Sequence, residues 1–278
     1  MALNLYPSSR PRSTGEILDT AFHIFKLTWL KGLPYGVLAM LAGQTQSLYY
    51  VLTRQPLRQF GGGDPRWWVF FILGTCVTLW MGSALLLRQA SLLEGKGSSF
   101  SAELRATLRR LPSLVAAVAV GFASVGVGFA LLGLPGVYLL IGLSLTAPAI
   151  LLSGKGPIAG LGYSLELVRG HWWRSFGSYA VGFSALLVFG MLAFIFVAVL
   201  LPFAGAGDVA VVTAFSQVLG VILGAAAAPF ISALVIALYA DLEERLTTKR
   251  RQEEAQAEQA AARTQQEKMP AADPVAPG

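Results

Sequence analysis

Long apolar runs without any Asp, Glu, Lys or Arg dominate the hydrophobic pattern of the chain. A helix needs about 20 apolar residues to cross a hydrocarbon core of about 30 Å, and each run is at least that long. One run of double length, from Pro112 to Leu152, contains Gly133 to Gly136 near its middle, which is typical of a tight turn between two helices. The pattern predicts an all-α membrane protein with six transmembrane helices at residues 32–52, 67–87, 112–132, 134–152, 176–203 and 209–240.

The last of these spans is longer than a membrane requires. Its 32 residues correspond to about 48 Å of helix, so it must tilt, kink or extend beyond the hydrocarbon. Pro229 favours a kink, because it lacks the N–H that bonds to the preceding turn. The alternative is a pair of half-helices that meet at Gly224.

Three amphipathic segments precede the first, third and fifth spans. Their apolar stripes are Ile17, Leu18, Ala21, Phe22, Phe25 and Trp29; then Phe100, Leu104, Leu108 and Leu111; then Ile158, Leu161, Leu165, Val168 and Trp172. This spacing predicts three cytoplasmic helices that lie in the membrane interface, the first starting near Thr14. The predicted organisation is a short N-terminal tail (1–13), a six-helix membrane domain (14–246), and a charged tail (247–278). We expect the tail to continue the last span for a few turns and to be largely disordered beyond them.

Short identical motifs indicate an internal repeat of one interfacial helix and two spans. Leu-Leu-x-Gly-Lys-Gly occurs at 92–97 and again at 151–156, and Ala-Val-Gly-Phe occurs at 119–122 and at 180–183. Duplication of the second unit into the third explains both pairs. The alternative is that Gly-Lys-Gly is only a common turn at the membrane surface.

The distribution of charge sets the orientation. Hydrophobic residues make up 55% of the 278 residues and charged residues only 13%, which argues against a water-soluble fold. Of the 21 Lys and Arg residues, 18 lie in the tails and in the connections after the second and fourth spans. The remaining three are Arg54, Arg58 and Arg66. The positive-inside rule therefore predicts that both termini lie in the cytoplasm. It also predicts that the basic residues contact a membrane surface rather than nucleic acid.

Candidate chemistry is sparse, so we expect no enzyme and no catalytic, cofactor or metal site. Cys76 is the single cysteine and lies within an apolar run, and the two histidines, His23 and His171, have no ligand cluster around them. Gly95-Lys96-Gly97 lacks the other residues of a phosphate-binding loop. A spatial cluster of Glu166, His171 and Asp241 is the arrangement that would favour an enzyme.

Basic and aromatic residues at the cytoplasmic ends of the spans form a candidate site for anionic lipids. The residues are Lys31, Arg109, Arg110, Trp172, Trp173 and Arg174. Cations near the headgroups attract anionic lipids by about 1 kcal/mol each, and tryptophan is suited to this level. The alternative is that they serve only as topology signals and aromatic anchors. A true site requires at least two of the basic positions to converge between helices.

Three stretches resemble a known family. Arg10-Pro11-Arg12-Ser13-Thr14-Gly15-Glu16-Ile17-Leu18-Asp19, the stretch from Ala147-Pro148 through Gly154-Lys155-Gly156 to Trp172-Trp173-Arg174, and Pro229-Phe230 through Tyr239 to Asp241-Leu242 carry the resemblance. The chain resembles, over residues 10–246, the bacterial glycerophosphoryl diester phosphodiesterase membrane domain-like proteins. The resemblance implies a six-helix protein of the bacterial cytoplasmic membrane without the catalytic domain.

Two function classes follow. The first is a non-enzymatic scaffold or accessory subunit of an envelope system, which the absence of charge from the spans and the amphipathic cytoplasmic segments favour. The second is a transporter or flippase for lipids or another apolar solute, which needs no charged coupling residue.

Overall fold

The computed structural model describes residues 13–53, 64–97, 99–131, 133–203 and 209–268. The helices in these ranges are α1 (Thr14–Gly43), α2 (Thr45–Thr53), α3 (Pro65–Leu93), α4 (Phe100–Ala130), α5 (Leu134–Gly142), α6 (Thr146–Leu151), α7 (Pro157–Val168), α8 (Trp172–Phe203) and α9 (Val209–Lys268). No strand occurs in these ranges, so the predicted all-α class is confirmed for this part of the chain.

Five helical stretches are long and apolar enough to cross a membrane. They are Pro65–Leu93, Phe100–Ala130, Leu134–Leu151, Trp172–Val199 and Phe215–Ala261. They coincide with the last five of the six predicted spans and are compatible with a multi-pass membrane protein. The first predicted span is not among them, so the count of six stays a prediction.

The first predicted span is divided between two helices. α1 ends at Gly43, the backbone N–H of Gln44 caps it, and α2 begins at Thr45. The Thr45 hydroxyl donates a hydrogen bond to the carbonyl of Phe70. Thr45 Oγ1 also lies only 2.0 Å from where a Cβ on Gly74 would stand. The chain therefore bends at Gln44, and α2 packs closely on α3 because Gly74 has no side chain.

Two of the three predicted interfacial helices are not separate elements. α1 begins at Thr14, as expected, with a capping box between Ser13 and Glu16, and continues through Pro34. α4 likewise continues through Pro112. Proline is tolerated inside membrane helices because neighbouring groups satisfy the freed carbonyl. Only α7 is separated from the helix that follows it, and Gly170 provides the turn with a φ of +84°.

The start of α4 buries polar residues rather than its apolar stripe. Glu103 is 2% exposed and Thr107 is fully buried, whereas Phe100 and Leu108 of the predicted apolar stripe are 42% and 47% exposed. In a membrane bundle the lipid-facing surface is as apolar as the interior, so the apolar stripe does not identify the packed face. Glu103 therefore belongs to the interior, although it lies outside the charge-free runs.

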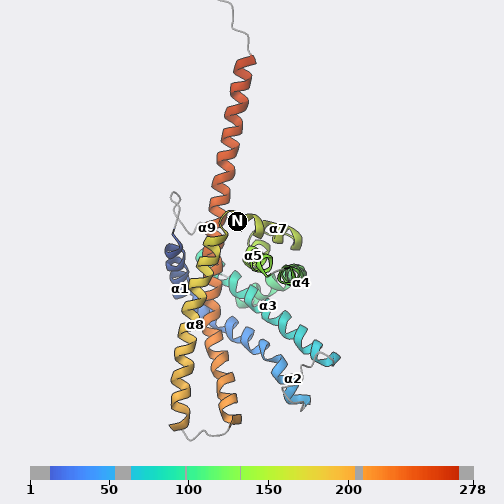
Figure 1. Cartoon of the computed structure of the whole chain (residues 1–278), viewed down its shortest axis with the longest axis vertical. Helices are drawn as coiled ribbons and strands as arrows, with labels where there is room; N and C mark the ends of the chain where they lie inside the picture. The colour runs from blue at the N-terminus through green and yellow to red at the C-terminus, as the bar shows by residue number, and fades with distance from the viewer. Residues whose placement is uncertain (1–12, 54–63, 98, 132, 204–208, 269–278) are drawn as a thin grey trace, which may run out of the picture.

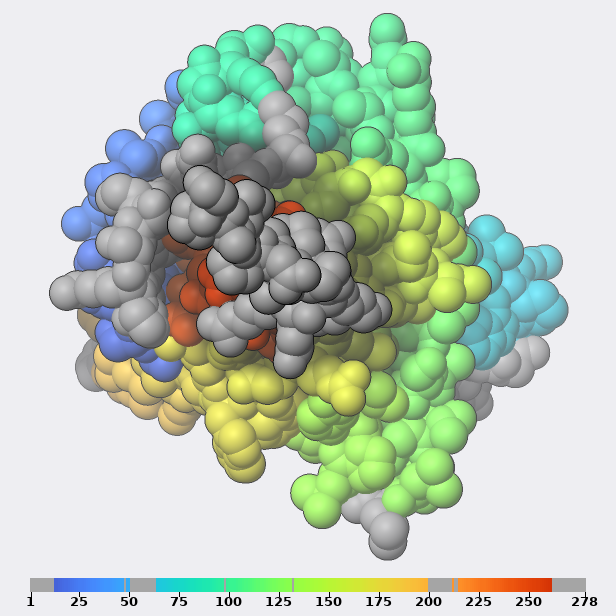
Figure 2. All heavy atoms as spheres, turned by 90° about the horizontal axis from the view of Figure 1, so that it is seen from above, coloured from blue at the N-terminus to red at the C-terminus, as the bar shows by residue number. Residues whose placement is uncertain are grey.

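α9 is the central helix of the packed part. Seen from above in Figure 2, its red segment lies between α1 in blue and α7 in yellow-green. Leu234, Ile236 and Leu238 of α9 are fully buried, and Ile17 and Ile24 of α1 join the same apolar core. The core thus lies where α1 packs along α9, at the end of the packed part from which α9 projects (Figure 1).

Small residues let α1 and α9 approach closely. α9 is continuous through Gly224 and Pro229, so two half-helices are not formed there. Proline lacks the N–H that would bond the carbonyl one turn earlier, which here belongs to Ala225. That carbonyl oxygen stands 2.5 Å from where a Cβ on Gly36 would lie, and the Pro229 ring stands 3.3 Å from where one on Gly32 would lie. Gly32 and Gly36 thus form the part of α1 that lies closest to α9.

α9 continues far beyond the packed core. Residues 247–268 form a straight helical extension, here called the stalk, that projects from the rest of the molecule (Figure 1). Every residue from 247 to 261 is exposed. The expectation that only a few turns would be helical is wrong, because the stalk consists largely of strong helix formers and pairs Lys249 with Glu253 one turn later.

Pairs of neighbouring helices diverge from the apolar core around α1 and α9. In Figure 1, α8 and the lower part of α9 run downward, α2 and α3 run diagonally, and α4 is seen end-on. α8 is the least covered of the candidate spans, with 6% of its most apolar window buried. The diverging arrangement leaves long apolar helix faces to be covered by lipid or by other proteins.

The two Gly-Lys-Gly motifs form matching turns. Gly95 and Gly154 have φ angles of +67° and +66°; Gly95 directly follows the C-cap of α3, and Gly154 lies two residues after the C-cap of α6. A positive φ is accessible to glycine at little cost, and it terminates helices in this way. The matched geometry favours duplication, but α4 continues without interruption after the first turn, whereas α7 and α8 follow the second as separate helices.

Candidate functional site

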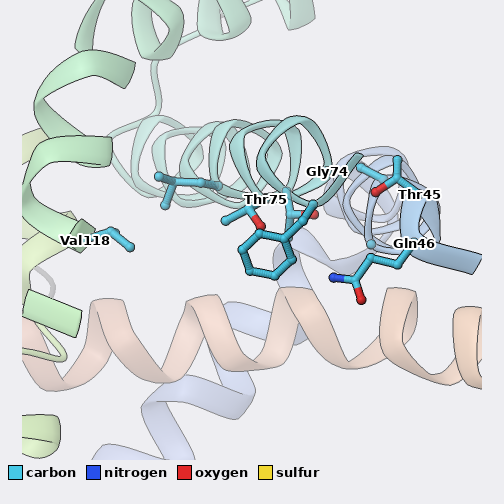
Figure 3. Close-up of a pocket in the computed structure, with 10 residues that line it drawn as sticks. Thr45, Gln46, Gly74, Thr75 and Val118 are labelled. Atoms are coloured by element: carbon cyan, nitrogen blue, oxygen red, sulfur yellow. The ribbon is translucent and has the colours of Figure 1, made fainter. Parts of the chain in front are cut away.

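An apolar groove lies between the α2–α3 pair and the α4–α5 pair of helices. It consists of two adjoining hollows of about 300 and 500 Å³ that share Leu79 of α3 and Val118 of α4. The smaller hollow lies between α2, α3 and α4, and Figure 3 shows Thr45 and Gln46 at one end of it and Val118 at the other. The larger hollow follows α4 from Leu114 to Phe129 and is closed by α5, α6 and Leu161.

Most polar groups in this groove are already bonded to the backbone. Thr78 donates to the carbonyl of Ala39, and the hydroxyls of Ser144 and Thr146 bond within their own turns. The Gln46 side chain is half-buried and, within the described residues, has no hydrogen-bond partner. No charged residue lines either hollow. The groove can therefore hold an apolar molecule with a polar group at the Gln46 end.

A buried ion pair joins three helices near this groove. Arg88 Nη1 of α3 lies 2.9 Å from Glu103 Oε1 of α4, and the other carboxylate oxygen accepts a hydrogen bond from the Tyr35 hydroxyl of α1. On α3, Trp80 Nε1 donates to the carbonyl of Leu104 at 2.9 Å. Sequence reasoning missed this cluster because Glu103 was assigned to an interfacial helix. The contacts tie α4 to α1 and α3, which form one wall of the groove.

A second polar connection joins α3 to the central helix. The amide of Gln89 donates to the Thr28 hydroxyl of α1 and to the carbonyl of Pro229 in α9, both at 2.9 Å. Gln89 is fully buried. Among the described residues no donor reaches its Oε1 atom. The single side chain therefore cross-links three helices at the proline of α9.

At the base of the stalk, Asp241 is the centre of a charge cluster. It accepts hydrogen bonds from Arg174 at 3.2 Å and from Arg245 at 2.9 Å. Burial, together with the charges of Arg245 and Arg174, lowers the pKa of nearby His171. His171 is thereby kept neutral at physiological pH, which is the form that adds no further positive charge beside two arginines.

The same region contains a hydroxyl and carboxylate cluster. Ser153 and Tyr239 share a hydrogen bond of 2.6 Å, and both contact Glu243. Burial and the Glu243 charge raise the pKa of Tyr163 to about 12, so its hydroxyl stays protonated and donates to Glu243. The Lys155 ammonium lies 4.2 Å from the centre of the Tyr163 ring. These contacts fix the second Gly-Lys-Gly turn to α7 and α9.

The proposed cluster of Glu166, His171 and Asp241 does not form as a set. Glu166 instead pairs with Arg250 at 2.6 Å on the surface of the stalk base. Among the residues described, no group of three or more His, Cys, Asp or Glu side chains stands at metal-binding spacing. The carboxylates of this region bind arginines and hydroxyls, which is a structural arrangement.

The predicted anionic-lipid residues fall into three groups. Lys31 and Arg109 are exposed. Arg110 and Arg174 are engaged internally: Arg110 donates to the carbonyl of Ile150 at the end of α6, and Arg174 binds Asp241. Trp172 and Trp173 pack edge to face, and Trp172 also donates to the carbonyl of Tyr138. The lipid site stays a prediction. Its test is the amount of anionic phospholipid that co-purifies with the Arg110→Gln and Arg174→Gln variants.

Comparison with known proteins identifies a family. The model of the family described as a domain of unknown function (DUF7847) matches residues 69–242, more than half of the chain. The chain belongs to the DUF7847 family. The DUF7847 match extends from α3 to Leu242 and so contains the lining of the larger hollow and Asp241, while α1, α2 with the Gln46 end of the smaller hollow, and the stalk lie outside it. The match does not test the resemblance to the glycerophosphoryl diester phosphodiesterase membrane domain-like proteins, which stays a prediction.

No curated protein and no solved structure matches the chain.

Proposed function

We propose that this DUF7847 protein is a non-enzymatic scaffold or accessory subunit of an envelope system in the bacterial cytoplasmic membrane. The observation that carries the proposal is the stalk, which places a helix of about 33 Å outside the packed core. Its residues from 247 to 261 are exposed, and Arg250 at its base pairs with Glu166 of α7. Packing, the main source of helix stability in proteins, therefore contributes little along most of the stalk. A partner that binds the stalk supplies that packing. The uncovered face of α8 supports the same proposal within the membrane.

Removing the stalk should abolish partner binding. The test is a pull-down in mild detergent from cells expressing a tagged chain at its native level. With a chain ending at Leu246, the amount of co-purified partner should fall at least about tenfold, because the docking helix is absent. A chain ending at Lys268 is the matched control and should retain it. A full-length chain that always emerges alone contradicts the proposal.

The proposed orientation has both termini and the stalk in the cytoplasm and six spans in the membrane. It is supported by the bias of 18 basic residues against three. Reporter fusions after residues 97, 157 and 250 should read cytoplasmic, and those after 64, 135 and 207 should read external. One reversed reporter in this series overturns the six-span arrangement.

A transporter or flippase for lipids is the second candidate, and the apolar groove is the observation that favours it. Lipid flux in vesicles that depends on Gln46 would decide for this candidate over the scaffold.

A further inference from the structure

The shape of the groove suits a thin, elongated occupant. The larger hollow follows α4 from Leu114 to Phe129, a distance of about 22 Å along a helix. The smaller hollow continues it past Leu79 and Val118 towards Gln46. A long, apolar hollow of this kind suits a single hydrocarbon chain.

The surroundings of the groove indicate where its occupant comes from. Its walls are α3 and α4, which are both candidate membrane spans, and Phe122 at its edge is 80% exposed. The groove therefore opens sideways into hydrocarbon.

The chemistry of the lining excludes a charged headgroup from the groove itself. Neither hollow is lined by an Asp, Glu, Lys or Arg residue. At one end, the Gln46 amide has no partner among the described residues, while the hydroxyl of its neighbour Thr45 is bonded to Phe70. A primary amide can donate to an ester carbonyl, the polar group that stands at the head of a lipid acyl chain.

We propose that this groove binds one acyl chain of a membrane glycerolipid, with the ester group beside Gln46 and the chain running past Leu79 and Val118 along α4. The lipid lies between the α2–α3 pair and the α4–α5 pair of helices, and it fills the space that opens where these two pairs diverge. This site goes beyond the scaffold role, because it assigns a ligand to the membrane domain whether or not a protein partner binds the stalk.

Filling the groove should displace the lipid. Val118 lines both hollows and is 46% exposed, while Val120, two residues later on α4, is 48% exposed and lines neither. The full chain is placed in vesicles of phosphatidylglycerol and phosphatidylethanolamine that contain phosphatidylcholine with a photoreactive diazirine in its acyl chain. Val118→Trp should lower cross-linking to α3 and α4 peptides about fivefold or more and remove one lipid retained in native mass spectrometry. Val120→Trp should change neither.

A second variant keeps the test decisive if the tryptophan disturbs folding. Gly126 lines the larger hollow, and a Cβ built there meets nothing within 4 Å, so Gly126→Leu fills the groove without a clash and favours the helix. It should reproduce the loss seen with Val118→Trp. Equal cross-linking and equal retained lipid in the wild type and in the folded Val118 or Gly126 variants overturn the proposal.

Discussion

Replacing Glu103 by alanine should be among the most damaging single substitutions in the chain. The change leaves Arg88 without its carboxylate and Tyr35 without its acceptor in the interior between α1, α3 and α4. Breaking a buried ion pair by removing one partner costs about 3–5 kcal/mol, and we expect the lower part of this range because Arg88 keeps 17% of its side chain exposed. The measurement is the unfolding free energy in mixed micelles.

Two further variants separate the buried charge from general damage at this position. Glu94→Ala is the matched control, because Glu94 pairs with exposed Lys96 and should cost less than about 1 kcal/mol. The double variant Arg88→Met, Glu103→Met removes both charges and should be more stable than Glu103→Ala alone. A double variant as unstable as Glu103→Ala would show that the ion pair is not the cause.

Gly36→Ala should separate α1 from α9. The added Cβ would stand 2.5 Å from the carbonyl oxygen of Ala225, and a backbone atom cannot move aside as a flexible side chain can. Overpacking of this kind costs about 1–3 kcal/mol, and the backbone obstacle favours the upper part of the range. The loss should appear as a lower thermal midpoint and as lower recovery of monodisperse protein.

The cause can be traced to the proline of α9. Pro229→Ala restores the N–H that can bond the Ala225 carbonyl, so it should draw that oxygen back into its own helix and lessen the harm of Gly36→Ala. Gly43→Ala is the control on the same helix, because nothing lies within 4 Å of its Cβ position. It should leave the thermal midpoint unchanged within the measurement error. Strictly additive effects of Gly36→Ala and Pro229→Ala would contradict this explanation.

The long helices were the predictable part of this fold. Charge-free runs located α3, α4, α8 and α9, since the length of an apolar run follows directly from membrane thickness. The bend at Gln44 was not predicted, because it depends on the contact of Thr45 with Gly74. The helical stalk was underestimated because a lack of apolar periodicity was taken as a sign of disorder, although helix propensity alone favoured a helix.

The interior polar contacts were not predictable from local pattern. Arg174 and Asp241 are 67 positions apart, so no single window of sequence contains both partners. Leu79 is likewise distant in sequence from its groove neighbours on α4. The inward direction of Glu103 was missed for a different reason. Lipid and protein interior are equally apolar surroundings, so the apolar stripe of α4 did not indicate that the opposite, polar side packs inward.

The continuity of α9 has a mechanical consequence. Its 60 residues form one rod of about 90 Å, uninterrupted at Pro229, that joins the membrane interior to the tip of the stalk. A rod of this kind acts as a lever. A tilt of about 10° at the base of the stalk moves the end of its 33 Å arm by about 6 Å. A small rearrangement of the helices around Ala225 would thus become a displacement large enough for a bound partner to sense.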